Sequence, residues 1–147
     1  VGVATRPSVA RDPMTIYLDT SALVAVAVDG AARTVVIDAL ETDADWCSSA
    51  LSMGEAMALV ARLTDEEVLQ NDLEDAVRLL WDRVAVVPVD QSCLDRAARI
   101  VREQPVKIAD AIHLAAADRL PRPVTYVTFD PAQIPVALSM GFDVHST

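Results

Sequence analysis

The chain has 147 residues, of which 52% are hydrophobic and 4% aromatic, and its formal net charge is −10 at pH 7. This length and composition predict one compact domain with a substantial core and exclude a disordered chain. The net negative charge argues against binding of nucleic acid by a generally basic surface. Acids that share a divalent cation, however, would present a much less negative face to a substrate.

Short apolar runs alternate with helical patterns along most of the sequence. Strands are predicted at residues 15–18, 46–48, 84–89, 124–127 and 142–144. Helices are predicted at residues 21–28, 31–41, 50–63, 65–81, 91–102, 107–118 and 131–140. This alternation predicts an α/β fold in which helices cover both faces of a mainly parallel sheet.

The ends of these elements suggest one folded domain after a loose N-terminal segment. Residues 1–13 are predicted to be a flexible arm and residues 14–147 a single domain, so the true start is either Val1 or Met14. Thr20 or Ser21 is expected to cap the first helix, and Thr64 the helix that begins at residue 65. Because no apolar stretch approaches the roughly 20 residues that span a bilayer, we expect a cytoplasmic protein without membrane contact.

Four carboxylates stand beside apolar runs. Asp19 and Asp130 directly follow predicted strands, whereas Glu55 and Asp110 interrupt apolar helices that we expect to be buried. An ionised carboxylate loses hydration in such a place and needs a cation or hydrogen-bond donors. Ligands of open parallel sheets gather outside the carboxyl ends of the strands. Oxygen ligands without paired Cys or His indicate Mg²⁺, or Mn²⁺, rather than structural zinc.

Each acid taken alone also has a structural interpretation. Asp19 could cap the helix that follows it, and Asp130, which precedes Pro131, could be a turn or cap residue. Glu55 and Asp110 could be helix acids at the edge of the core. Two carboxylates about 4 Å apart repel by roughly 4 kcal/mol at an effective dielectric constant near 20, so a cluster needs a cation or protons. The joint pattern favours a shared metal site.

Two further residues lie one turn from Asp110. Lys107 could pair with Asp110 or contact a substrate phosphate, and the sequence leaves both roles open. His113 is interpreted as a core or supporting histidine in preference to a catalytic base.

At these residues the chain resembles PIN-domain ribonucleases, and among them the VapC-type toxins of bacterial toxin–antitoxin pairs. The matching segments are residues 17–23 (YLDTSAL), 49–55 (SALSMGE), 107–116 (KIADAIHLAA) and 126–130 (YVTFD). Each segment is weakly specific by itself, whereas their order and spacing together are specific. The resemblance extends from Met14 to Val144 and implies a PIN-like three-layer α/β/α sandwich with about five short strands.

The resemblance also implies a function and a site. Asp19, Glu55 and Asp110 carry over as the main metal ligands and Asp130 as the fourth acid, with Ser21 and Thr128 as auxiliary hydroxyls. The implied activity is hydrolysis of RNA by a metal-activated water, which leaves a 5′-phosphate and a 3′-hydroxyl. The implied partners are the RNA substrate and a VapB-type antitoxin, with a toxin homodimer in the complex. Pro131 replaces a basic residue often found after the fourth acid, which weakens the expectation of RNA contacts there.

Two other classes of protein remain as alternatives. A noncatalytic interaction module would use the acids only as caps and in salt bridges, and it would not depend on metal. A phosphoaspartyl phosphatase would place its nucleophile at Asp19 but would need a second Asp two residues later, where this chain has Ser21.

Overall fold

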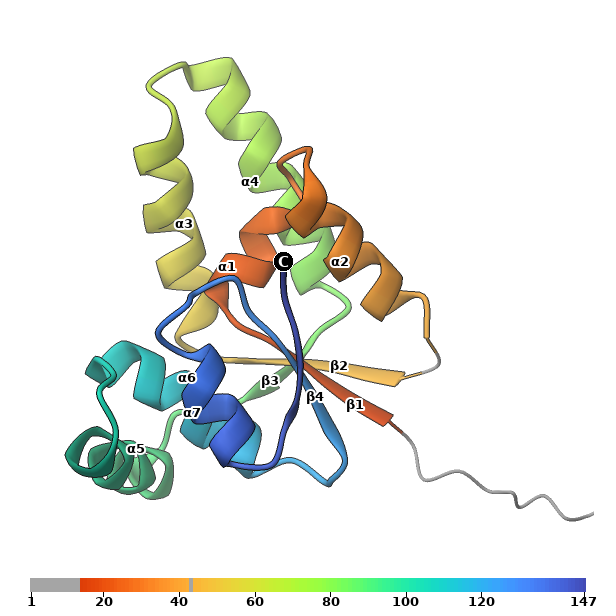
Figure 1. Cartoon of the computed structure of the whole chain (residues 1–147). Coiled ribbons are helices and arrows are strands. Elements are labelled where there is room, and N and C mark those ends of the chain that lie inside the picture. The colour runs from red at the N-terminus through yellow and green to blue at the C-terminus, as the bar shows by residue number, and fades with distance from the viewer. Residues whose placement is uncertain (1–13, 43) are drawn as a thin grey trace, which may run out of the picture.

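A computed structural model describes residues 14–42 and 44–147 (Figure 1). The predicted N-terminal arm, residues 1–13, lies outside the described residues. The strands are β1 (Met14–Leu18), β2 (Ala44–Ser49), β3 (Ala85–Val87), β4 (Val124–Val127) and β5 (Asp143–His145). They form one sheet in the order β3-β2-β1-β4-β5, and every neighbouring pair is parallel. The predicted parallel sheet of five short strands is confirmed.

Helices pack on both faces of this sheet. One face is covered by α1 (Thr20–Ala25), α2 (Ala31–Leu40), α3 (Ser52–Leu63) and α4 (Glu67–Trp81), and the other by α5 (Gln91–Glu103), α6 (Ile108–Asp118) and α7 (Ile134–Ser139). Successive side chains of a strand point to opposite faces. Ile16 and Leu18 therefore join the core beneath α1–α4, while Tyr17 joins the core beneath α5–α7. These two cores confirm the three-layer α/β/α sandwich.

The order of the strands creates a switch point between β1 and β4. From β1 the chain adds β2 and then β3 on one side, and it then crosses to the other side of β1 to add β4 and β5. In open parallel sheets the crevice at such a point, outside the carboxyl ends of the strands, is where ligands bind. Asp19 follows β1 and Asp130 lies three residues beyond β4.

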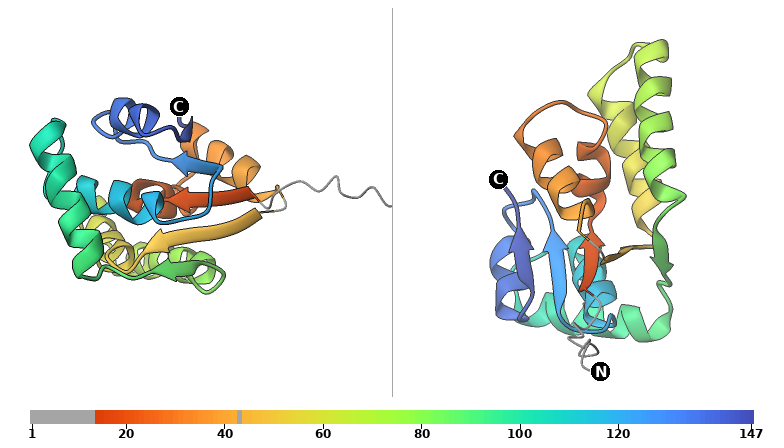
Figure 2. Two further views of the ribbon diagram at one scale, coloured as in Figure 1. Left: turned by 90° about the horizontal axis from the view of Figure 1, so that it is seen from below. Right: turned by 90° about the vertical axis from the view of Figure 1, so that its right-hand side faces the viewer.

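Helix α3 is more exposed than its apolar sequence predicted. Only Ser52, Ala56 and Val60 are buried along it. Figures 1 and 2 show that α3 and α4 form a hairpin that projects beyond the sheet, so α3 packs along one side on α1 and α4 and its other side is exposed. The prediction of a buried helix was therefore wrong.

The caps of two helices also differ from prediction. Asp19 caps α1 in place of Thr20 or Ser21, as the structural interpretation of this acid proposed, and its side chain accepts a hydrogen bond from Ala22 N. Helix α4 begins at Glu67, after Glu66 as its N-cap, so the predicted start at residue 65 was wrong. The Thr64 hydroxyl instead accepts from Glu66 N at 3.1 Å, which forms a local turn before the helix.

Among residues 14–42 and 44–147, no helix combines the length and the apolarity that a bilayer-spanning segment needs.

Candidate active site

Asp19 is the most enclosed of the four acids, with 1% of its surface exposed. Its Oδ1 accepts hydrogen bonds from Ala22 N at 2.9 Å and from Ser21 Oγ at 2.6 Å, and its Oδ2 accepts from Thr128 Oγ1 at 2.6 Å. Burial raises the pKa of Asp19, and the nearby His113 and the three donors act in the opposite direction. The protein thus holds this carboxylate in one orientation.

The two hydroxyls that bond Asp19 also join the ends of β1 and β4. Ser21 Oγ accepts from Phe129 N at 3.0 Å, and Thr128 Oγ1 accepts from Asp130 N at 3.1 Å. Each hydroxyl therefore donates to Asp19 and accepts from the loop after β4. Ser21 and Thr128, both expected as auxiliary residues, connect the first acid to the loop that carries the fourth.

Glu55 projects from the first turn of α3 toward α1 and α6. Its Oε1 lies 2.6 Å from Thr20 Oγ1, which donates, and 2.6 Å from His113 Nε2. The hydrogen bond from His113 is the main reason why the pKa of Glu55 is lowered. Its side chain keeps 31% of its surface exposed, so Glu55 is available to a ligand in the cavity.

A buried tyrosine sets the orientation of His113. Tyr17 OH lies 2.7 Å from His113 Nδ1, and both side chains are buried. Because burial raises the pKa of Tyr17, its hydroxyl keeps its proton and forms a hydrogen bond with Nδ1. With Nδ1 bonded to the tyrosine, Nε2 faces the Glu55 carboxylate and donates to it. The arrangement supports the interpretation of His113 as a supporting residue.

A second series of hydrogen bonds, which begins at Tyr126, reaches the other two acids. Gln133 Nε2 donates to Asp110 Oδ1 at 3.0 Å and lies 3.4 Å from Asp130 Oδ2, while Gln133 Oε1 accepts from Tyr126 OH at 2.6 Å. Burial, followed by the charge of Asp130, raises the pKa of Asp110. The rings of Tyr17 and Tyr126 stack at a centroid distance of 5.3 Å, so both series of hydrogen bonds begin at the same buried pair of rings.

These side chains meet around one cavity of about 170 Å³. Its lining consists of Asp19, Thr20, Ser21, Glu55, Leu59, Asp110, His113, Asp130 and Gln133. All four predicted acids are therefore brought together, along with Ser21 and His113. Thr128 is fully buried and contacts the cavity through Asp19, and Lys107 lines an adjoining pocket instead.

The donor set suits a divalent cation. The cavity offers carboxylate and hydroxyl oxygens, which are the ligands that Mg²⁺ and Mn²⁺ prefer, and the repulsion between Asp110 and Asp130 would be relieved by positive charge. Within the part of the chain that the structure describes, no three His, Cys, Asp or Glu side chains already lie close enough to hold a metal. The carboxylates of Glu55 and Asp110 instead bond to His113 and Gln133, and binding would exchange these bonds for the ion.

Sequence reasoning missed four residues of this site: Tyr17, Thr20, Tyr126 and Gln133. Thr20 could have been suspected because it stands between Asp19 and Ser21, two residues that the resemblance already placed in the site. The tyrosines look like core residues of apolar strands, and Gln133 lies where a helix from residue 131 was predicted. In the structure a turn precedes α7, because Asp130 accepts from Ala132 N and Gln133 N.

The sequence matches the PIN domain family over residues 16–137. Since this match covers most of the chain and the fold agrees with it, the chain belongs to the PIN domain family. A search against curated proteins found no significant match.

Several solved structures share the fold. VapC20 of Mycobacterium tuberculosis, described as a sarcin-ricin loop cleaving toxin, is 20% identical with a TM-score of 0.65 over 88% of this chain and 98% of its own. VapBC2 from Rickettsia felis, solved with a promoter DNA fragment, is 12% identical with a TM-score of 0.66, covering 89% and 98%. FitAcB from Neisseria gonorrhoeae is 20% identical with a TM-score of 0.63, covering 88% and 95%. The expected similarity to VapC-type toxins is thus confirmed for the fold.

Proposed function

We propose that this PIN-domain protein is a divalent-metal-dependent endoribonuclease and the toxin of a type II toxin–antitoxin pair. The observation that carries the proposal is the convergence of four acids from α3, α6 and the two strand ends on one cavity at the switch point of the sheet. Membership of the PIN domain family and the fold shared with VapC20 support a nuclease that acts on RNA.

In this proposal Asp19, Glu55 and Asp110 hold Mg²⁺ or Mn²⁺, and Asp130 completes the acidic set. A divalent cation bound there would lower the pKa of a water and offset the charge that develops on the phosphate. The chain's own residues prepare the site. Attack by water, not by the ribose 2′-hydroxyl, leaves a 5′-phosphate and a 3′-hydroxyl.

The preparation consists of hydrogen bonds that fix each carboxylate. Ser21 and Thr128 hold Asp19, while His113 fixes Glu55 and Gln133 fixes Asp110. These donors favour the ionised acids, which are the forms that bind a cation. They act against the burial that raises the pKa values of Asp19 and Asp110, and a bound cation would favour the ionised forms further.

The proposed partner is a VapB-type antitoxin, in a complex that contains a toxin homodimer. Several structures with this fold are toxin–antitoxin complexes, including those from Klebsiella pneumoniae and Rickettsia felis. We expect the product of the adjacent upstream gene to co-purify with this chain and to inhibit its cleavage of RNA. Failure of the two purified proteins to bind would refute the pairing without affecting the nuclease.

A noncatalytic interaction module is the second candidate, because every one of the four acids has a hydrogen-bond partner within the protein. A phosphoaspartyl enzyme is disfavoured, since Asp19 is enclosed and both of its oxygens accept hydrogen bonds. Metal dependence separates the noncatalytic interaction module from the nuclease.

The test is incubation of end-labelled total RNA with wild type and Asp19→Asn, each with Mg²⁺, Mn²⁺ or EDTA. We expect cleavage by wild type in either metal, no cleavage in EDTA, and a loss of at least about 100-fold in the variant. Circular dichroism should show that Asp19→Asn keeps the fold. Equal cleavage by both proteins, or cleavage that persists in EDTA, would contradict the mechanism.

A further inference from the structure

A larger pocket, called here the flanking pocket, continues the acidic cavity toward the loop between α5 and α6. Its volume is about 390 Å³, and Asp110 and Asp130 line both it and the acidic cavity. This volume lies within the roughly 300–1,000 Å³ typical of small-molecule sites. A ligand with a phosphate at the acids would therefore place its next unit in the flanking pocket.

The wall of the flanking pocket combines apolar side chains with one cation. Val101, Pro105 and Val106 supply the apolar part, and Lys107 lies beside them at the N-cap position of α6. The loop is held by hydrogen bonds from Gln104 N to Ile100 O and from Val106 N to Gln104 O. An apolar wall next to a cation suits a unit that has a flat base and a phosphate.

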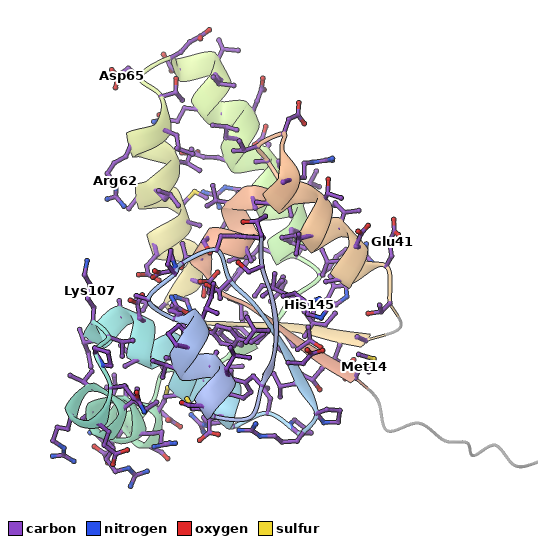
Figure 3. All side chains as sticks on the ribbon, viewed as in Figure 1. Met14, Glu41, Arg62, Asp65, Lys107 and His145 are labelled. Carbon is purple, nitrogen blue, oxygen red and sulfur yellow. The ribbon has the colours of Figure 1, made fainter. Side chains whose placement is uncertain are left out.

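Lys107 is the single lysine of the chain, in a protein whose net charge is −10. Its side chain is exposed and projects outward from the start of α6 (Figure 3). No ion pair joins it to Asp110 or to another acid of the described residues. Of the two roles that the sequence left open, pairing with Asp110 is thus not observed, and Lys107 is available to a phosphate.

We propose that the flanking pocket binds the nucleotide adjacent to the scissile phosphate of single-stranded RNA. Lys107 contacts the backbone phosphate of that nucleotide, and its base packs against Val101, Pro105 and Val106. Bases in a duplex are stacked and paired, whereas an unpaired base can turn into a pocket. The inference rests on the proposed function, because it places the scissile phosphate at the acids.

The first test is binding of a short fluorescein-labelled single-stranded RNA in EDTA, measured by fluorescence anisotropy at several salt concentrations. Lys107→Gln is compared with Arg62→Gln, which removes the same charge from an exposed position on α3 (Figure 3). We expect Lys107→Gln to raise Kd about 5- to 10-fold and to reduce the salt slope by about 1. Arg62→Gln should change Kd less than about 2-fold. Equal effects of the two variants would overturn the proposal.

The apolar wall is tested with Val101→Ser, for which Val68→Ser on the exposed face of α4 is the control. We expect Val101→Ser to raise Kd about 3-fold with an unchanged salt slope, since it removes apolar contact and no charge. An unchanged Kd for Val101→Ser would refute the contact between the base and this wall.

The single lysine permits a direct footprint. An amine-acetylating reagent should modify Lys107 more slowly when the single-stranded RNA is bound in EDTA, and peptide mass spectrometry separates this site from the α-amino group. Equal rates with and without RNA would contradict the proposal, as would equal protection by a duplex of the same sequence.

If wild type cleaves RNA but Lys107→Gln binds RNA as wild type does, the assignment of the flanking pocket is wrong and the proposed nuclease activity is unaffected. If wild type shows no metal-dependent cleavage, the proposed function fails and the pocket's assignment fails with it.

Discussion

The four acids differ in how firmly the protein holds them. Asp19 accepts three hydrogen bonds in a buried position, whereas Asp130 lies on a partly exposed turn and contacts Gln133 at 3.4 Å. A firmly oriented carboxylate needs little rearrangement to become a ligand. We therefore assign Asp19 the central role in the proposed site and Asp130 the most adjustable one.

Gln133 should matter for stability, because one buried amide bonds Asp110 and Tyr126. Gln133→Leu would leave the buried hydroxyl of Tyr126 without its acceptor and remove a donor from Asp110. We expect the free energy of unfolding in urea to fall by about 1–3 kcal/mol. The exposed Gln91 provides a control, and Gln91→Leu should change stability by less than about 0.5 kcal/mol.

Tyr17→Phe tests whether the tyrosine acts through His113 on Glu55. The variant keeps the ring but removes the hydroxyl that bonds His113 Nδ1, so the imidazole is no longer held with Nε2 toward Glu55. We expect a loss of about 1–2 kcal/mol in unfolding free energy and a decrease of roughly 10-fold in metal-dependent cleavage. An equally destabilised variant with full cleavage would show that the hydroxyl only supports the core.

At the level of residues, the sequence predicted the acids but not the groups that orient them. Asp19, Glu55, Asp110 and Asp130 stand out because charge beside apolar runs is costly. Tyr17 and Tyr126 do not stand out, because a tyrosine in an apolar strand looks like an ordinary core residue. The sequence does not reveal which group its hydroxyl bonds. Their roles depend on the pairing of β1 with β4, which puts them opposite each other in register.

Among the elements, the turn between α7 and β5 provides a stability test. Gly141 has φ = +87°, and a Cβ there would lie 3.3 Å from the side chain of Arg122. Gly54, in contrast, lies exposed on α3, where a Cβ would meet nothing within 4 Å. We expect Gly141→Ala to lower the unfolding free energy by about 1 kcal/mol or more and Gly54→Ala to raise it by about 0.5–1 kcal/mol. A shift of the same sign in both variants during thermal unfolding would contradict this assignment.

The elements were largely predictable in number and order, and the errors occurred at their ends. Alternating apolar runs and helical periods predicted the parallel sheet, because both signals are local. The predicted starts of α4 and α7 were wrong, because Thr64 and Asp130 accept hydrogen bonds that form turns before these helices. The exposure of α3 depends on how its hairpin with α4 leaves the sheet, which no local pattern reveals.

For the whole molecule, the proposed site implies a conflict between stability and function. Burial raises the pKa of Asp110, so the folded protein binds that proton more tightly than the unfolded chain. The resulting cost is absent below the unfolded pKa of about 3.9, develops as pH rises from there to the raised folded pKa, and is complete above it. In EDTA at pH 7 we expect Asp110→Asn to melt roughly 2–4 °C above wild type, and the two proteins to converge near pH 4. A constant difference across this pH range would contradict the assignment.

The most direct test of the account is calorimetric titration of wild type and Asp110→Asn with Mn²⁺ at neutral pH. The exposed Asp65 on the loop before α4 offers a charge-matched control, Asp65→Asn (Figure 3). We predict that wild type and Asp65→Asn bind Mn²⁺ alike and that Asp110→Asn raises Kd by at least about 10-fold. The same Kd in all three proteins would contradict the claim that the four acids form a metal site.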